Sequence, residues 1–203
     1  MDTDSALRFG SEAGQLFKTV RTWKALKEDG VVMQSSDYSC GAAAVATLLT
    51  HTFGDEVGER AIMDAIVHSL SATEKKDRQE HGFSLLDLSD FVSARGYEST
   101  GFRLSFAQLR DILLPALVHL SVEGNRHFVV LERIQGDRIY LADPSHGHTR
   151  LSVDAFAKQW THIVLVVTKA GGATPPSRPA DPEGELVLDR MLSAYTTVVR
   201  TGL

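Results

Sequence analysis

The sequence predicts an α+β protein in which helices come first and an antiparallel sheet follows. Helix-like segments lie between residues 40 and 95, and short β-rich segments separated by turns follow between residues 97 and 168. This order is typical of domains whose helices gather on one face of an antiparallel sheet. The chain has 203 residues, of which 43% are hydrophobic and 23% charged, as in ordinary globular proteins. A fibrous or wholly disordered protein is therefore excluded.

Changes in composition divide the chain into three regions. We expect residues 1–30 to form a polar, helical N-terminal extension, which Asp29-Gly30 would end. Residues 31–168 would form the main domain. Residues 169–203 begin as a linker rich in Gly and Pro and continue into a segment, 185–200, that could form a terminal helix.

Within the main domain, each element has its own local signal. Good helix formers follow Cys40, further helices are expected over 58–70 and 84–95, and the charged segment 71–81 is expected to be a loop. The helix over 84–95 opens with Ser-x-x-Asp, which resembles a capping box. Expected strands cover 97–102, 116–122, 127–134, 138–142 and 162–168, with short helices over 106–113 and 153–160.

Charge and composition exclude several function classes. The net charge of −5 and the lack of a basic stripe disfavour a nucleic-acid partner. The longest apolar runs, such as 163–167, are far too short to cross a bilayer. The acidic N-terminus lacks a secretory signal pattern, so the chain is either cytoplasmic or an exported protein whose signal is not part of this sequence. A single cysteine excludes an internal disulfide and a Cys-rich zinc site, and no other metal or cofactor is expected.

Cys40 is the first candidate catalytic residue. It lies where a polar loop enters an apolar helix, and the N-terminus of a helix favours the thiolate form of a cysteine. Gly41 beside it would let backbone N–H groups come close to a substrate carbonyl. A lone cysteine at a helix start can also be a small buried hydrophobic residue, so position alone does not decide its role.

His127, Asp143 and Gln34 could complete a catalytic site. His127 opens an apolar β run and could be a general base, and Asp143 ends the next strand before Pro144. If the two strands form a hairpin, both residues lie at one edge of the sheet, where the carboxylate could orient the imidazole. The side-chain amide of Gln34 could donate to an oxyanion together with the Cys40 N–H. Taken singly, these could be a structural histidine, a turn and a solvated glutamine.

In combination, these motifs resemble those of a known family. The chain is similar to the C39 peptidases at Gln34-x-x-Asp37-x-x-Cys40-Gly41-Ala42-Ala43, at His127-Phe128-Val129-Val130-Leu131 and at Asp143-Pro144. These are bacterial cysteine peptidases with a papain-like fold that cut leader peptides after a Gly-Gly pair, often as domains of peptide-exporting transporters. The resemblance covers about residues 31–168 and implies Cys40 as nucleophile, His127 as base, Asp143 as orienter and Gln34 in the oxyanion hole.

The resemblance also implies a function and a context. We expect a cysteine endopeptidase that cleaves after small residues, with a Gly-Gly leader or a secretion-system substrate. The alternatives are a C39-like module that binds a secretion substrate without cutting it, and an acyltransferase or deamidase on the same fold. Transporter spans and an ATPase domain are absent from this sequence, as in a stand-alone family member that accompanies functional-amyloid secretion systems. That context implies a periplasmic protein with amyloid or secretion components as partners.

Overall fold

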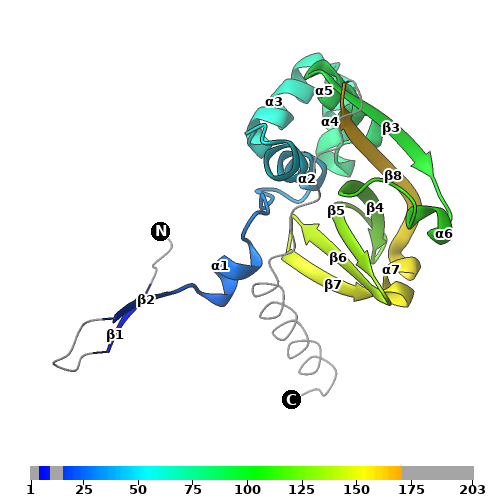
Figure 1. Cartoon of the computed structure of the whole chain (residues 1–203). Coiled ribbons are helices and arrows are strands. Elements are labelled where there is room, and N and C mark those ends of the chain that lie inside the picture. The colour runs from blue at the N-terminus through cyan, green and yellow to red at the C-terminus, as the bar shows by residue number, and fades with distance from the viewer. Residues whose placement is uncertain (1–4, 10–15, 171–203) are drawn as a thin grey trace.

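Six antiparallel strands, in the order β3-β8-β4-β5-β6-β7, form the central sheet of the main domain (Figure 1). The computed structural model describes residues 5–9 and 16–170. The strands β4 to β7 follow one another through short turns, and β8 returns to lie between β3 and β4. The strands are β3 (Tyr97–Arg103), β4 (Ala116–Val122), β5 (Asn125–Gln135), β6 (Arg138–Asp143), β7 (Gly147–Ser152) and β8 (Trp160–Lys169).

The central helix α2 (Cys40–Leu48) packs directly on the sheet. Its sequence CGAAAVATL is rich in small residues, and all nine are buried. Small side chains allow a helix to approach its neighbours closely on every side, which explains a helix with no solvent face. Gly41 shows how close the packing is, because a Cβ there would lie 3.0 Å from Leu88 Cδ1 and 3.3 Å from Phe128 Cδ2.

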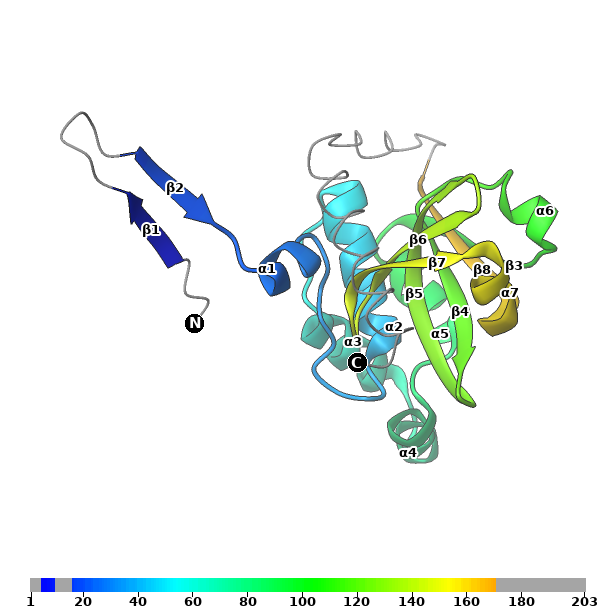
Figure 2. The same cartoon turned by 90° about the horizontal axis from the view of Figure 1, so that it is seen from below.

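Further helices surround α2 and the sheet (Figures 1 and 2). Helix α2 continues into one π-helical turn, Leu49–Phe53, which ends at Gly54 with a φ of 70°. The helices α3 to α5 lie on the same side of the sheet as α2, whereas α6 and α7 belong to the opposite side. Their bounds are α3 (Glu59–Ser69), α4 (Ala72–His81), α5 (Leu85–Ala94), α6 (Phe106–Leu109) and α7 (Val153–Gln159).

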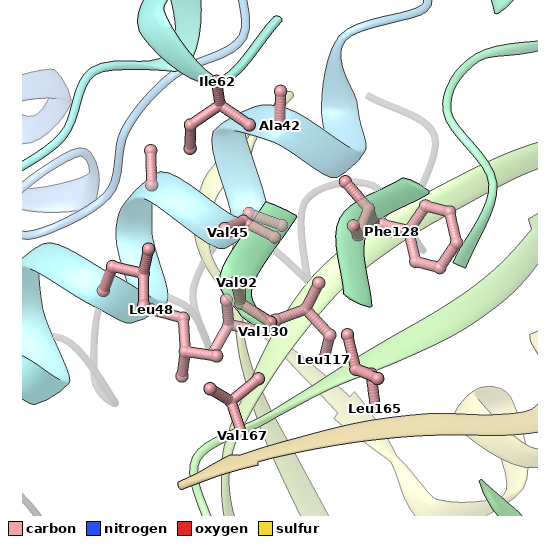
Figure 3. Packing of buried hydrophobic residues seen from close by; sticks show 14 of the residues in the cluster. Ala42, Val45, Leu48, Ile62, Val92, Leu117, Phe128, Val130, Leu165 and Val167 are labelled. Atoms are coloured by element: carbon pink, nitrogen blue, oxygen red, sulfur yellow. The ribbon is translucent and has the colours of Figure 1, made fainter. Parts of the chain in front are cut away.

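The sheet is buried on both faces, so its central strands are apolar at successive positions. One face packs against α2, α3 and α5 in a cluster that includes Leu117, Val130 and Leu165 of the strands (Figure 3). The other face packs with α7 around Phe156 and Val118. Side chains alternate between the two faces of a strand, and adjacent residues of β4 and β8 accordingly belong to different clusters.

The helices expected after Cys40 and over 58–70, 84–95 and 153–160 are found, and the five expected strands are all present. Three local predictions were wrong. The segment 71–81 is not a loop but helix α4, which begins with a capping box between Ser71 and Glu74, a signal also readable in the sequence. The strand β7 was missed, and the helix expected over 106–113 ends at Leu109.

The N-terminal region corrects the expected helical extension over 1–30. Its described part contains two antiparallel strands, β1 (Ser5–Phe9) and β2 (Leu16–Val20), and the single short helix α1 (Trp23–Lys27). The apolar residues Leu16, Val20, Trp23 and Leu26 recur at three- and four-residue spacing, which favours a helix. The strand-forming residues of Phe-Lys-Thr-Val and their pairing with β1 outweigh that pattern. The expected linker and terminal helix of residues 171–203 lie outside the described residues.

The segment after α1 is tied to the start of β7. Gly147 has a φ of 73°, and a Cβ at this position would overlap the backbone oxygen of Lys27. His148 Nε2 lies 2.8 Å from the backbone oxygen of Asp29. The turn between β6 and β7 therefore requires glycine both for its backbone conformation and for this close contact.

Replacing Gly147 by alanine should destabilise the domain more than a matched glycine replacement. Gly136 has a φ of 57°, but a Cβ added there would meet nothing within 4 Å, so Gly136→Ala tests the conformational cost alone. We expect Gly136→Ala to cost about 1–2 kcal/mol and Gly147→Ala about 1–3 kcal/mol more. Urea unfolding of both variants measures the difference, and equal losses would show that the Lys27 segment simply moves away.

Candidate active site

Cys40 is the first residue of α2, and the end of the helix around it is not capped by a side chain. The Ser39 hydroxyl, which could cap it, instead donates to the Ser36 backbone oxygen at 2.8 Å and accepts from the Ser36 N–H at 3.1 Å. The N–H groups of a first helical turn have no acceptor within the helix. The thiol therefore lies beside open N–H groups and the positive end of the helix dipole.

His127 joins Cys40 to Asp143. Its Nε2 lies 2.8 Å from Asp143 Oδ1, and the Cys40 side chain lies close enough to the ring to raise its pKa. Because Nε2 is used by the carboxylate, the ring nitrogen left for the thiol is Nδ1. The three side chains come from β5, α2 and the end of β6, and the antiparallel pairing of β5 with β6 confirms the expected hairpin.

The pKa of His127 is raised to about 9. Burial alone would lower it, but the hydrogen bond to the Asp143 carboxylate and its negative charge, together with the nearby Cys40 side chain, outweigh burial. The pKa of Asp143 is lowered although burial opposes this, because His127 and the Ser145 N–H stabilise its carboxylate. Near neutral pH the site therefore holds an imidazolium against a carboxylate.

Asp143 is itself held by the turn that follows it. Its Oδ1 accepts from the Ser145 N–H at 2.8 Å, and its Oδ2 lies 3.1 Å from His146 Nδ1. The side chains of His127 and Asp143 are 15% and 12% exposed. A carboxylate with donors on both oxygens is fixed in one orientation, which in turn fixes the ring of His127.

Gln34 lies against the same turn. Its N–H donates to the Pro144 backbone oxygen at 2.9 Å, its Nε2 donates to the Ser36 backbone oxygen at 2.9 Å, and its Oε1 accepts from the Ser145 hydroxyl at 2.7 Å. Gln34 also lines an open hollow of about 310 Å³ between residues 33–37 and Pro144-Ser145. The structure thus brings Gln34 to the rim of the site, whereas its donation to an oxyanion stays a prediction.

The loop that carries Gln34 is held from two further helices. The Val32 N–H donates to Thr47 Oγ1 of α2 at 2.9 Å, and the Ser35 N–H donates to Glu59 Oε1 of α3 at 2.9 Å. Glu59 is a buried carboxylate at 8% exposure. Sequence reasoning missed Glu59 and Ser145, because no motif marks them and only the tertiary structure brings them to the site. It weighed His146 only as a possible metal ligand and preferred a polar turn.

The other acidic and histidine side chains do not gather into a metal site. Within residues 5–9 and 16–170, no group of three or more His, Cys, Asp or Glu side chains is arranged to hold a metal ion. His148 Nδ1 lies 3.1 Å from Glu132 Oε2, whereas His146 Nδ1 lies 3.1 Å from Asp143 Oδ2, so the two histidines contact different carboxylates. In the same described part, no helix is long and apolar enough to span a membrane.

The sequence matches the profile of the Peptidase C39 family over residues 28–171. The chain belongs to this family. It is 36% identical over 158 residues to a probable functional amyloid protease, FapD, of Pseudomonas aeruginosa, covering 78% of this chain and 69% of the relative. The probable functional amyloid protease FapD of Pseudomonas fluorescens is 32% identical over 156 residues, covering 77% of this chain and 68% of the relative.

Solved structures show the same fold. A double glycine motif protease from an AMS/PCAT transporter, solved with its leader peptide, superposes with a TM-score of 0.57 at 25% identity, covering 68% of this chain and 89% of that one. The peptidase domain of Streptococcus ComA superposes with a TM-score of 0.58 at 19% identity, covering 68% of this chain and 97% of that domain. These likenesses confirm the predicted papain-like fold with helices on an antiparallel sheet, and the family membership makes the chain a cysteine peptidase.

The raised pKa of His127 should be measurable directly. In NMR spectra of the labelled chain, His127 should titrate near pH 9, assigned among the eight histidines by its loss in His127→Gln. Asp143→Asn keeps an acceptor but removes the charge, so the pKa should fall towards the ordinary value of about 6.5. A His127 signal that titrates near 6.5 in both proteins would contradict this electrostatic account.

Proposed function

We propose that this chain is a cysteine endopeptidase that cleaves peptides after small residues, with a Gly-Gly leader or a secretion-system protein as substrate. The observation that supports it is that His127 is hydrogen-bonded to Asp143 and lies beside Cys40 at the open end of α2. Because the sequence holds a single cysteine, the nucleophile of a cysteine peptidase here is Cys40.

The reaction begins with the Cys40 thiolate paired with the His127 imidazolium. The sulfur attacks the scissile carbonyl carbon and forms a tetrahedral oxyanion. His127 then transfers its proton to the leaving amine, the C–N bond breaks and an acyl-enzyme remains. In the second half, the now neutral His127 takes a proton from water, the resulting hydroxide attacks the thioester, and the thiolate and imidazolium are restored.

The oxyanion would be stabilised by two donors. The Cys40 N–H belongs to the first turn of α2, whose N–H groups have no acceptor within the helix. The Gln34 amide has two N–H bonds, of which one is used by the Ser36 backbone oxygen, and the second is left for substrate. Loss of a single oxyanion donor typically costs about 10²–10³-fold in rate.

Asp143 would act through His127. It holds Nε2, so that Nδ1 faces the thiol, and its charge stabilises the imidazolium. The three donors on Asp143 keep it ionised and in place while His127 loses and regains its proton. This is the division of labour of a nucleophile, a base and an orienting carboxylate.

The substrate class is supported by the relatives. One is called a double glycine motif protease and was solved with a leader peptide, and two are called probable functional amyloid proteases. We therefore extend to this chain a substrate with a small-residue cleavage site that belongs to a secretion or amyloid system. A substrate that belongs to an amyloid secretion system would place the chain in the periplasm, whereas a leader that is cut before export would place it in the cytoplasm.

Incubation with a leader-type peptide should give cleavage directly after Gly-Gly, read by mass spectrometry. Cys40→Ala should lower the rate by about 10³-fold or more, because the nucleophile is lost. Matched peptides with Ala in place of either glycine should be cut more slowly. Full cleavage by Cys40→Ala would refute the mechanism, whereas equal cleavage of the Ala peptides would refute only the glycine preference.

A further inference from the structure

The side-chain amide of Gln34 is held in one of its two flipped orientations. One of its terminal atoms lies 2.9 Å from the Ser36 backbone oxygen, which can only accept a hydrogen bond. That atom must therefore be Nε2, and the oxygen Oε1 must be the atom that faces Ser145. The Ser145 hydroxyl donates to it at 2.7 Å, the only other side-chain contact described for this amide.

Ser145 contacts both halves of the site with two different groups. Its backbone N–H donates to Asp143 Oδ1 at 2.8 Å, and its hydroxyl donates to Gln34 Oε1. The first contact supports the carboxylate behind His127, and the second fixes the amide on the oxyanion side. The neighbouring bond from the Gln34 N–H to the Pro144 backbone oxygen holds the two segments at this spacing.

We propose that Ser145 is a positioning residue for the peptidase reaction, whose hydroxyl orients the Gln34 amide so that its free N–H points to the developing oxyanion. The inference rests on the proposed roles of Cys40 and Gln34. Without the hydroxyl, Oε1 has lost its donor and the amide can rotate, and rotation exposes an oxygen to a negatively charged intermediate. Through Gln34, the serine thus affects the stability of the tetrahedral intermediate and not the reactivity of the thiolate.

Ser145→Ala separates the two contacts. Alanine keeps the backbone N–H that supports Asp143, so the pairing of Cys40 with His127 should persist. Only the hydroxyl bond to Gln34 is removed, and Ser145 is exposed, so the fold itself should hold. The variant should therefore slow steps that pass through an oxyanion and leave other reactions of the thiolate unchanged.

Two small probes distinguish these steps on the full chain. Iodoacetamide reacts by displacement, in which the sulfur forms a bond to carbon and iodide leaves with the electron pair, and no oxyanion forms. p-Nitrophenyl acetate reacts at its carbonyl, where the sulfur forms a thioester through an oxyanion and p-nitrophenolate leaves. We expect Ser145→Ala to lower the acetylation rate on the order of tenfold, a part of the loss of a whole oxyanion donor, with the iodoacetamide rate unchanged.

Matched variants complete the experiment. Ser145→Thr keeps the hydroxyl and should restore acetylation, and Ser145→Ala should add no further loss in a Gln34→Ala background. Ser93 of α5 is an exposed serine whose hydroxyl lies 3.2 Å from the Ser99 hydroxyl. Ser93→Ala removes that hydrogen bond and is the control, which should change neither rate. Unchanged acetylation, or an equal fall in both reactions, would overturn the role of Ser145. A wild-type chain that reacts with neither probe would overturn the proposed function, and this inference with it.

Discussion

The bond between His127 and Asp143 is the interaction on which the rest of the site depends. Burial disfavours a charged imidazole, and only the adjacent carboxylate and thiol reverse this and raise the pKa of His127 to about 9. The carboxylate can be there because β5 and β6 pair as a hairpin and bring the start of one strand to the end of the other. Because helices pack on both faces of the sheet, a slip of one residue would move each side chain into the opposite cluster, whose packing it does not fit.

The short turn between β6 and β7 supplies several of the groups that form and support the site. Within residues 143–147 it supplies the carboxylate, an N–H and a hydroxyl from Ser145, the backbone oxygen that holds Gln34, and the glycine against Lys27. Helix α2 supplies the thiol from the opposite side, with its N-terminus open because Ser39 bonds to Ser36. The reacting groups thus lie on rigid elements, and the turn aligns them with the loop before Cys40.

Much of this could be predicted from sequence, and the failures have physical causes. The helix after Cys40 and the hairpin that joins His127 to Asp143 follow from local composition and turn signals, whereas the grouping of Cys40 and Gln34 with this hairpin was implied by the resemblance to the C39 peptidases. The N-terminal strands were missed because the apolar spacing from Leu16 to Leu26 also fits a helix, and their pairing cannot be read from local spacing. Ser145 and Glu59 could not be found, since their contacts join segments far apart in the chain. The roles of Cys40, His127, Asp143 and Gln34 remain predictions.

The most direct test of the account is the rate at which iodoacetamide modifies Cys40 as a function of pH, read by intact mass. Because the chain has one cysteine, every adduct reports on this residue. If His127 is an imidazolium beside the sulfur, wild-type Cys40 should be modified faster than Cys40 of His127→Ala at about pH 6.5, because the positive ring favours the reactive thiolate. His127→Ala should react slowly at the lower pH and accelerate as pH rises. A wild-type rate that rises with pH in the same way as that of His127→Ala would contradict the account.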